Sequence, residues 1–408
     1  MRILAINCGS STLKFKLVEV GGEGSAPNRG HAVASGGVER IGGAQPAVDF
    51  SSENDQSLQQ PTDVEDHDEA TRSVLGWLRS TDLVSPEGPE AVGHRIVHGG
   101  DRFSEPALIG DEAMEAIGSL VELAPLHNGP SLGAIRAARA ALGSSVPMVA
   151  VFDTAFHRTL PEHAAQYAIP RGLTDKYHIR RYGFHGIAHR YMTERYAAIT
   201  DTPVEQAKLV TLQLGNGCSA TAVKDGRSID TSMGFTPLEG LMMGTRSGNI
   251  DPFLLEFLSR QESVDVAEVE DWLNTRSGLL GVSGISRDVR ELLETEAQGD
   301  ARAALALEMF CYKVRKYIGA YFAVLDGADA VVFGGGIGEN APQVRERICA
   351  GMNWCGLELD RERNTSTVGS ESRISTEDSR VHAYVVPVDE EMMIAHDTFH
   401  CLRRRKRE

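Results

Sequence analysis

Paired-cysteine motifs, long apolar runs and an excess of basic residues are all missing from this sequence. Its six cysteines show no Cys-x-x-Cys spacing, so we interpret them as reduced thiols of a cytoplasmic protein. No apolar run approaches the length that spans a membrane, and Met1 and Arg2 lead directly into a strand pattern without the apolar stretch of a signal peptide. We therefore expect neither a membrane partner nor a secretion signal.

Acidic residues outnumber basic ones. The chain has 57 Asp and Glu against 41 Lys and Arg, and its formal net charge of −16 at pH 7 argues against general binding to nucleic acids or anionic membranes. A site for an anionic ligand must therefore gather its own arginine, histidine and backbone N–H donors. The 408 residues are 41% apolar and 24% charged, which is ordinary for a globular protein and enough for two domains with full cores.

The first fifteen residues read as a β-hairpin whose turn can face an anion. The apolar run 3–6 precedes the small polar residues 7–12, and a second, alternating run follows. Backbone N–H groups and hydroxyls in such a turn can approach a phosphate closely, and Lys14 adds positive charge. An ordinary polar turn is the alternative, because motifs this short also occur by chance.

The same pattern recurs in the second half of the chain. A strand pattern precedes residues 215–219, and the segment from Asn216 to Thr221 repeats the device of the segment from Asn7 to Thr12. We interpret this as an internal repeat of a functional hairpin. Two similar halves, each with a phosphate-facing hairpin, indicate a nucleotide held in a cleft between two lobes.

Four polar side chains stand out from apolar or glycine-rich surroundings. Arg95 interrupts an apolar strand pattern and is either half of a structural ion pair or a ligand clamp. Arg246 can neutralise a phosphoryl group or a carboxylate, or it is a surface arginine in a flexible turn. His185, close to glycines, is either structural or a ligand. Asp153 follows a buried strand pattern, where a carboxylate suits Mg²⁺ or caps the next helix.

A glycine-rich segment near the C-terminus gives a further nucleotide-binding signal. A strand pattern at 330–333 runs into the glycine loop 334–340, and a helix pattern follows. The loop lacks Gly-Lys-Ser/Thr, so it is not a P-loop, and it is not a clean dinucleotide fingerprint. Elsewhere, the clearest helix is predicted at 301–325, and residues 21–62 are predicted to form irregular loops or short edge strands.

Eight motifs, taken in order, resemble those of the acetate kinase family, within the acetate and sugar kinase, Hsp70 and actin superfamily. They cover nearly the full chain, and eight in this order are highly specific although each is weak by itself. The motifs lie at residues 7–14, 93–100, 152–157, 182–186, 214–217, 243–248, 336–340 and 389–391. The resemblance implies a two-lobed α/β fold of the actin-like ATPase type, with duplicated βββαβα, ribonuclease H-like cores and the active site in the interlobe cleft. It places an N-terminal lobe at 1–154 plus 391–408 and a C-terminal, nucleotide-binding lobe at 155–390.

The resemblance also implies an activity, the reversible transfer of a phosphoryl group from ATP to acetate by direct in-line attack, giving acetyl phosphate and ADP. The cofactor would be Mg²⁺, with Mn²⁺ as an alternative, and the residues that organise it would be Asn7, Asp153 and Glu390. The residues that bind the carboxylate and the phosphoryl group would be Arg95, Arg246 and His185. No general base is required, because a carboxylate is already ionised at pH 7. The family is usually homodimeric.

Two binding sets follow from the same motifs. The residues expected to contact ATP are Lys14, Asn216, Gly217, Asp288, Arg290, Gly336, Ile337, Gly338 and Asn340. The residues expected to bind acetate are Arg95 at the carboxylate and Val97, Leu126, Phe184 and Pro237 around the methyl group. One extra methylene changes binding by about 1–3 kcal/mol, so propionate should be a poorer substrate and not an excluded one.

The sequence departs from the family pattern at a few positions. Gln213, Asn249 and Asp389 replace the usual His, Asp and Asn, and residues 128–131 read Asn-Gly-Pro-Ser instead of Asn-Pro-Ala-Asn. No proposed catalytic group is lost, and these departures leave the rate, the metal geometry and the acyl preference open. The alternatives are a propionate or butyrate kinase and a non-enzymatic actin- or Hsp70-like ATP-binding protein, which would need no paired arginines for a carboxylate.

Overall fold

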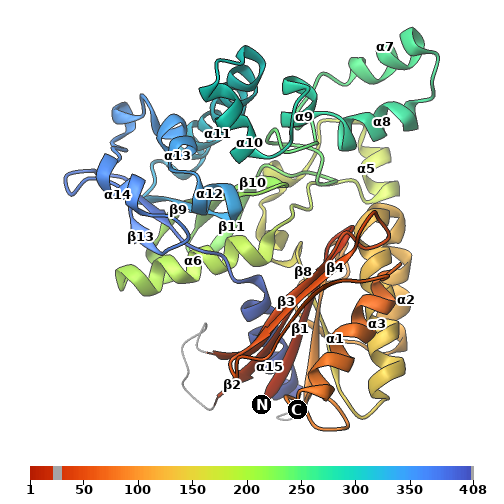
Figure 1. Ribbon diagram of the computed structural model, residues 1–408. Coiled ribbons are helices and arrows are strands. Elements are labelled where there is room, and N and C mark those ends of the chain that lie inside the picture. The colour runs from red at the N-terminus through yellow and green to blue at the C-terminus, as the bar shows by residue number, and fades with distance from the viewer. Residues whose placement is uncertain (22–29, 406–408) are drawn as a thin grey trace. The chain divides into compact units, whose positions relative to one another are not determined.

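Two compact units make up the chain, and a computed structural model describes its residues 1–21 and 30–405 (Figure 1). The side chains of residues 123 and 125–127 lie outside that description. The first unit is Met1–Ala155 with Asp389–Glu408, and the second is Phe156–Val388. The resemblance placed Asp389 and Glu390 in the C-terminal lobe, but in the structure both belong to the first unit. The reason is local, because Asp389 forms an ion pair with Lys16 and Glu390 accepts a hydrogen bond from Asn7.

The first unit is built around one mixed sheet. Its strands are β1 (Arg2–Cys8), β2 (Thr12–Val20), β3 (Gly30–Glu39), β4 (Ala47–Ser52), β5 (Ser57–Pro61), β6 (Ala91–Ile96), β7 (Ala107–Leu108) and β8 (Met148–Phe152). Its helices are α1 (His67–Ser80), α2 (Asp111–Ser119), the 3₁₀ turn η1 (Val121–Leu123), α3 (Pro125–Leu142) and α15 (Glu390–Arg405). The strand order is β5-β4-β3-β2-β1-β6-β8-β7, antiparallel from β1 to β5, with β6 parallel to β1 and β8 parallel to β6.

The N-terminal hairpin is confirmed. β1 and β2 pair with Asn7 opposite Lys14, and the N–H of Gly9 donates to the carbonyl of Thr12 at 2.8 Å. The segment 30–61, predicted as loops or short edge strands, extends the sheet as β3, β4 and β5. Pairing with β2 decides this, since a weakly patterned segment becomes a strand once a neighbouring edge satisfies its backbone groups.

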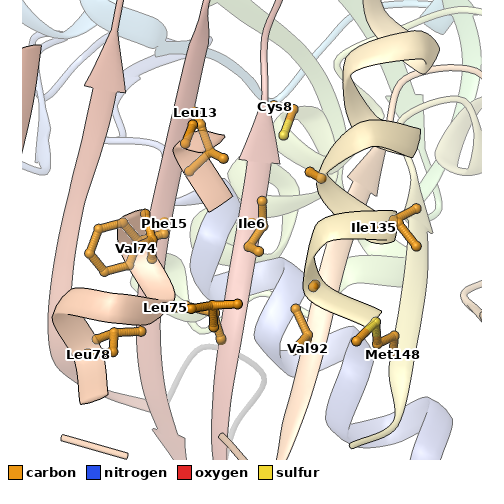
Figure 2. Close-up of a cluster of buried hydrophobic side chains, with 14 of the residues drawn as sticks. Ile6, Cys8, Leu13, Phe15, Val74, Leu75, Leu78, Val92, Ile135 and Met148 are labelled. Atoms are coloured by element: carbon orange, nitrogen blue, oxygen red, sulfur yellow. The ribbon is translucent and has the colours of Figure 1, made fainter. Parts of the chain in front are cut away.

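Side-chain alternation divides the sheet into an apolar face and a mixed face. Ile6, Leu13 and Phe15 lie on the apolar face, which packs on α1 and α3 (Figure 2). Figure 2 also shows Val74, Leu75, Leu78, Val92, Ile135 and Met148 in this core. Successive residues of a strand point to opposite faces, so Asn7 and Lys16 lie on the other face, which α15 contacts. Polar site residues therefore emerge on the α15 side.

The second unit repeats the topology of the first. Its strands are β9 (Lys208–Leu214), β10 (Cys218–Lys224), β11 (Arg227–Thr231), β12 (Ala330–Gly334), β13 (Ser372–Arg373) and β14 (His382–Val385). Their order is β11-β10-β9-β12-β14-β13, with β9, β10 and β11 antiparallel and β12 and β14 parallel to β9. This is the order β3-β2-β1-β6-β8 of the first sheet. The prediction of two α/β lobes with duplicated cores is confirmed.

Helices pack on both faces of the second sheet. They are α4 (Glu162–Ala165), α5 (Arg171–Tyr177), α6 (Gly186–Thr200), α7 (Phe253–Glu262), α8 (Val266–Thr275), α9 (Gly278–Ser283), α10 (Val289–Ala297), α11 (Ala301–Leu325), α12 (Gly335–Asn340), α13 (Pro342–Cys349) and α14 (Arg361–Ser366), with the 3₁₀ turns η2 (Ala155–Thr159), η3 (Val204–Gln206) and η4 (Asn353–Cys355). α11 has the predicted bounds and begins where the Asp300 carboxylate accepts from the N–H groups of Arg302 and Ala303. Within the described part of the chain, no helix is long and apolar enough to cross a bilayer.

Candidate active site

Arg95 is the centre of a buried polar cluster in the first unit. Its guanidinium donates to Asp153 Oδ2 at 2.7 Å and to Asn7 Oδ1 at 3.0 Å. Asn7, Arg95 and Asp153 stand at the carboxyl ends of the parallel strands β1, β6 and β8, which meet at one edge of the sheet, where ligands bind in open α/β sheets. Of the two interpretations left open for Arg95, the structure contains the ion pair.

The N-terminus of α15 adds two more carboxylates to this cluster. The side-chain NH₂ of Asn7 donates to Glu390 Oε2 and to Glu391 Oε1, both at 2.8 Å. Burial raises the pKa of Glu390, and the nearby carboxylates of Asp153 and Glu391 raise it further, while Arg95 opposes the shift. Glu391 lies within a quoted motif, but the sequence assigned it no role. The run of three acidic residues at 389–391 is the sequence feature that could have pointed to Glu391.

The cluster holds more negative than positive charge. Burial by itself would lower the pKa of Arg95, but Asp153, Glu390 and Glu391 raise it above its ordinary value, so the guanidinium stays charged. One cation therefore faces three carboxyl groups. In the described residues, no group of three or more His, Cys, Asp or Glu forms a complete metal site. The donor set fits Mg²⁺, which commonly takes one or two carboxylates and completes its coordination with phosphate and water.

Lys14 and Lys16 have different environments on β2. Lys14, predicted to contact ATP, is exposed, and the structure gives it no close anionic group among the described residues. Lys16, two residues further on the same face, forms an ion pair with Asp389 at 2.6 Å. Asp389 also accepts from the N–H of Met392 at 3.0 Å and so caps the start of α15. The departure at residue 389 thus provides an ion pair that an Asn could not form.

His185 heads a chain of hydrogen bonds in the second unit. It precedes α6 in the left-handed conformation, with φ of 56°, an unusual backbone state that clusters at functional sites. Its Nδ1 lies 2.8 Å from Ser219 Oγ, which lies 2.7 Å from His189 Nε2. His189 Nδ1 lies 2.8 Å from Thr211 Oγ1. No motif in the sequence pointed to Ser219, His189 or Thr211, although His189 lies four residues after His185 along α6.

Gly217 marks the place where His185 and Arg246 converge. A Cβ atom added to Gly217 would lie 3.5 Å from His185 Nε2 and 3.6 Å from Arg246 Nη1. Asn216, next to it, is exposed at the turn and accepts from the N–H of Gly244 at 3.0 Å. The predicted site residues His185, Arg246 and Asn216 are thus neighbours in the structure, and they lie around Gly217, which has no side chain.

Arg246 is a mostly buried cation without an acidic partner among the described residues. Its guanidinium donates to the carbonyl of Pro237 at 3.3 Å and approaches Met243 Sδ at 3.8 Å. Burial lowers the pKa of Arg246, and no carboxylate restores it. A guanidinium kept from water without a counter-charge is costly, so this position favours an anionic ligand.

The predicted glycine loop is a short helix. Residues 335–340 form α12, and two side chains stabilise it. Glu339 Oε1 accepts from the N–H of Gly335 at 2.8 Å, and the Asn340 side chain donates to the Gly336 carbonyl at 3.0 Å. The loop prediction was wrong because glycine has a poor helix propensity, which these two side-chain hydrogen bonds within the helix offset. Of the predicted ATP residues here, Gly336 and Asn340 are exposed, Ile337 is half-buried and Gly338 is buried.

A second predicted part of the adenosine pocket lies at the start of α10. Asp288 caps this helix by accepting from the N–H of Arg290 at 2.8 Å, and its carboxylate also pairs with the Arg290 guanidinium at 2.5 Å. Both side chains therefore already have each other as partners. The Arg290 side chain is 86% exposed, so the pair lies at the surface.

The residues predicted around the acetate methyl group belong to both units. Val97 and Phe184 are buried, and Pro237 is half-buried. Asn128 fixes the backbone next to Val97, since its side chain accepts from the N–H of His98 at 3.0 Å and donates to the His98 carbonyl at 3.1 Å. The fourth predicted residue, Leu126, has a side chain outside the described part of the structure.

Two other departures have structural accounts. The Asn249 side chain accepts from the N–H of Gly240 at 2.8 Å and donates to Tyr317 Oη at 2.8 Å, so its amide closes the loop that carries Arg246. Gln213 is paired with Ser219 across β9 and β10 and shares its face. Its side-chain oxygen is buried without a hydrogen-bond partner in the described structure.

Comparisons with known proteins agree over the whole chain. A model of the acetokinase family matches residues 2–396. The chain is 48% identical to an acetate kinase of Solibacter usitatus over 98% of both chains, and 46% identical to an acetate kinase of Chloroherpeton thalassium over 100% of both. The crystal structure of Porphyromonas gingivalis acetate kinase and that of a propionate kinase from Francisella tularensis each match with a TM-score of 0.89 and 40% identity, over 98% of this chain and 99% of theirs.

Proposed function

The chain belongs to the acetokinase family and transfers a phosphoryl group between ATP and acetate, and from this premise we propose how its residues perform the transfer. An acetate oxygen attacks the γ-phosphorus of ATP directly and in line. The new bond forms as the bond to the ADP oxygen breaks, and the reverse reaction uses the same groups. Such transfers depend on positioning and charge neutralisation, and the ionised carboxylate needs no base to activate it.

Arg246 is the residue on which this proposal chiefly rests. Its guanidinium is mostly buried and has no acidic partner among the described residues, so an anionic ligand supplies the missing charge. We assign it to the transferring phosphoryl group, whose oxygens accept the planar, paired N–H donors of arginine. His185, which shares the neighbourhood of Gly217 with Arg246, donates a hydrogen bond to the same group. The turn at Asn216 and Gly217 contacts the ATP phosphates.

Arg95 binds the acetate carboxylate in this scheme. Its two hydrogen bonds to Asp153 and Asn7 fix the plane of the guanidinium before substrate arrives, so less rotational freedom is lost on binding. The carboxylates around it raise the pKa of Arg95 above its ordinary value and so keep the guanidinium charged. For the methyl group we propose the residues that the family motifs indicate, which are Val97, Leu126, Phe184 and Pro237.

The metal site of the proposal is the acidic cluster of the first unit. Asp153 and Glu390 would hold Mg²⁺, or Mn²⁺ in its place, and Asn7 orients Glu390 and Glu391 through its NH₂ group. When bound, the ion would supply charge neutralisation to the phosphates of ATP. The excess of carboxylates over guanidinium supports this assignment. For the nucleoside of ATP we propose α12 (Gly336, Ile337, Gly338 and Asn340) with Asp288 and Arg290, and for its phosphate tail Lys14.

Propionate is the second candidate for the preferred acid. The propionate kinase of Francisella tularensis matches this chain with the same TM-score and identity as the acetate kinase of Porphyromonas gingivalis. The two acids differ by one methylene, and the binding difference of about 1–3 kcal/mol permits turnover of both. Acetate is favoured because the first relatives by sequence are all acetate kinases.

We also propose a homodimer and a cytoplasmic location. Helix α7 exposes Phe253, Leu254 and Phe257 and has no buried residue, which suits a surface that a second copy covers. The described cysteines are free, and burial raises the pKa of Cys8 and of Cys218 to about 12, as expected for thiols that never form disulfides.

The deciding experiment traps the acyl phosphate with hydroxylamine. The protein is incubated with ATP, Mg²⁺ and each acid from formate to butyrate, and hydroxamate formation is measured with and without a chelator. We expect the highest turnover with acetate, lower turnover with propionate, and none when Mg²⁺ is removed. A maximum at propionate would mean that propionate is the preferred substrate and would leave the proposed mechanism unchanged. Turnover that persists in the chelator would refute the metal assignment.

A further inference from the structure

Ser219 is placed to control which nitrogen of His185 carries a proton. Its hydroxyl bridges two imidazoles, 2.8 Å from His185 Nδ1 and 2.7 Å from His189 Nε2. A hydroxyl has one proton, so it donates to one ring and accepts from the other. The direction chosen at Ser219 therefore fixes the tautomer of His185, because each neutral imidazole protonates a single nitrogen.

His189 is neutral, which makes the chain directional. Burial lowers the pKa of His189 well below its ordinary value, and the nearby rings of His157 and His185 lower it further. A neutral ring donates from one nitrogen and accepts at the other. Either Thr211 donates to His189 and His189 donates to Ser219, or each of these bonds runs in the opposite direction.

The distances at Thr211 favour the first direction, and the proposed role of His185 agrees with it. In the reverse direction the Thr211 proton would have to go to the Thr221 carbonyl at 3.5 Å, whereas in the first it goes to His189 Nδ1 at 2.8 Å. The first direction also leaves His185 neutral with a proton on Nε2, the nitrogen near Gly217 and Arg246. The reverse would put the Nδ1 proton on His185, and Nε2 could then donate only from an imidazolium, a second cation close to Arg246.

We propose that Ser219 is a positioning residue that holds His185 as the neutral Nε2–H tautomer, so that His185 donates to the phosphoryl group without being protonated. This inference rests on the proposed role of His185 in the transfer. Ser219 receives its direction from His189 and Thr211, which lie behind it. In this scheme the histidine acts as a fixed neutral donor to the phosphoryl group, and Arg246 supplies the positive charge beside it.

The first test is spectroscopic and uses the unmodified protein. Histidine is labelled with ¹⁵N, and the His185 resonances are assigned by comparison with His185→Gln. At neutral pH we expect a protonated Nε2 and an unprotonated Nδ1. A protonated Nδ1, in either a neutral ring or an imidazolium, would overturn the proposal.

The second test is kinetic and has a matched control. Ser219→Ala should lower kcat about tenfold while the KM values for ATP and acetate stay within about twofold, the effect of losing one hydrogen bond that orients a donor. Thr221→Val is the control, because Thr221 is also fully buried, lies on the same face of β10, and bonds to Thr231 instead of the histidine chain. We expect its kcat to equal that of the unmodified protein.

A double-variant cycle separates this inference from the function on which it rests. In a His185→Ala background, Ser219→Ala should cause no further loss, because its effect passes through His185. If His185→Ala is slow but Ser219→Ala matches the Thr221→Val control, or if the two losses multiply, the role of Ser219 is refuted and that of His185 stands. If His185→Ala turns over normally, the proposed role of His185 itself fails.

Discussion

Replacing Arg246 with alanine should abolish turnover without destabilising the protein. The described structure gives its guanidinium only long contacts, 3.3 Å to the Pro237 carbonyl and 3.8 Å to Met243 Sδ. Both lie beyond the distances of strong hydrogen bonds. The stabilisation from these contacts is therefore small, whereas removing water from around the charged guanidinium costs free energy.

Removing the Arg246 side chain has two opposite effects on the stability of the protein and one large effect on kcat. A hydrogen bond from a charged donor contributes about 1.5–3 kcal/mol to stability at good geometry, and the 3.3 Å contact of Arg246 contributes less. Against it stands the cost of burial, which is why the pKa of Arg246 is lowered in the folded protein. The two effects nearly cancel, so the melting temperature should change by about 2 °C or less, or rise. An arginine that neutralises a transferring phosphoryl group, by contrast, contributes a factor of about 10³ to 10⁵ to kcat.

The assay compares Arg246→Ala with Arg302→Ala, a variant at an exposed arginine of the same unit whose side chain is 67% exposed. Hydroxamate formation at saturating ATP and acetate gives kcat, and thermal unfolding gives stability. We expect kcat to fall about 10³-fold or more for Arg246→Ala and to stay unchanged for Arg302→Ala. A kcat within about tenfold of the unmodified protein would refute the reasoning. A large loss of melting temperature would show that Arg246 is structural.

Three further predictions follow from the first unit and from the thiols. Arg95→Ala should lower both kcat and the melting temperature, because it leaves Asp153 buried without its cation. The free energy of unfolding should fall by about 3–5 kcal/mol. A loss of kcat at an unchanged melting temperature would contradict this prediction. Because the pKa of Glu390 is raised, the folded protein retains this proton to higher pH than the unfolded chain, so its contribution to stability falls as pH rises. The melting temperature of the metal-free protein should therefore decline as pH rises above the ordinary titration range of a glutamate, less so in Glu390→Gln, and Mg²⁺ should restore it at neutral pH. A thiol reagent should label the native protein only at its less buried cysteines. Rapid labelling of the buried cysteines would contradict this prediction. The less buried cysteines are Cys355 and Cys401.

The sequence predicted best the elements whose own residues determine them. The hairpin at β1 and β2 has alternating apolar residues on both sides of a small polar turn, and α11 has apolar residues at helical spacing with Asp300 at its start. The strands β3 to β5 and the helix α12 were mispredicted in part, since distant partners decide them. In α12, the buried Arg345 donates to the carbonyls of Gly338 and Glu339, contacts that no local pattern reveals.

The candidate site divides in the same way. Arg95, Asp153 and His185 could be singled out because a charged or ionisable side chain in an apolar or glycine-rich segment is unusual. The choice between ion pair and ligand clamp for Arg95 needed the distance to Asp153, which joins residues 58 positions apart. Ser219 and Thr211 could not be predicted, since hydroxyl side chains are common on strands. Only the structure shows that these two lie within hydrogen-bonding distance of His185 and His189.

The repeat explains where the site residues lie but not their chemistry. Both sheets have the same strand order, so in each the carboxyl ends of the parallel strands gather side chains at one edge. The first unit places three carboxylates and one arginine there, a surplus of negative charge that suits a divalent cation. The second unit brings together a histidine, a glycine turn and an arginine that has no acidic partner among the described residues, and this set suits an anion. A duplicated backbone therefore supplies two equivalent edges with opposite side-chain charge, and we propose that one holds the cation and the other the phosphates that a carboxyl kinase requires.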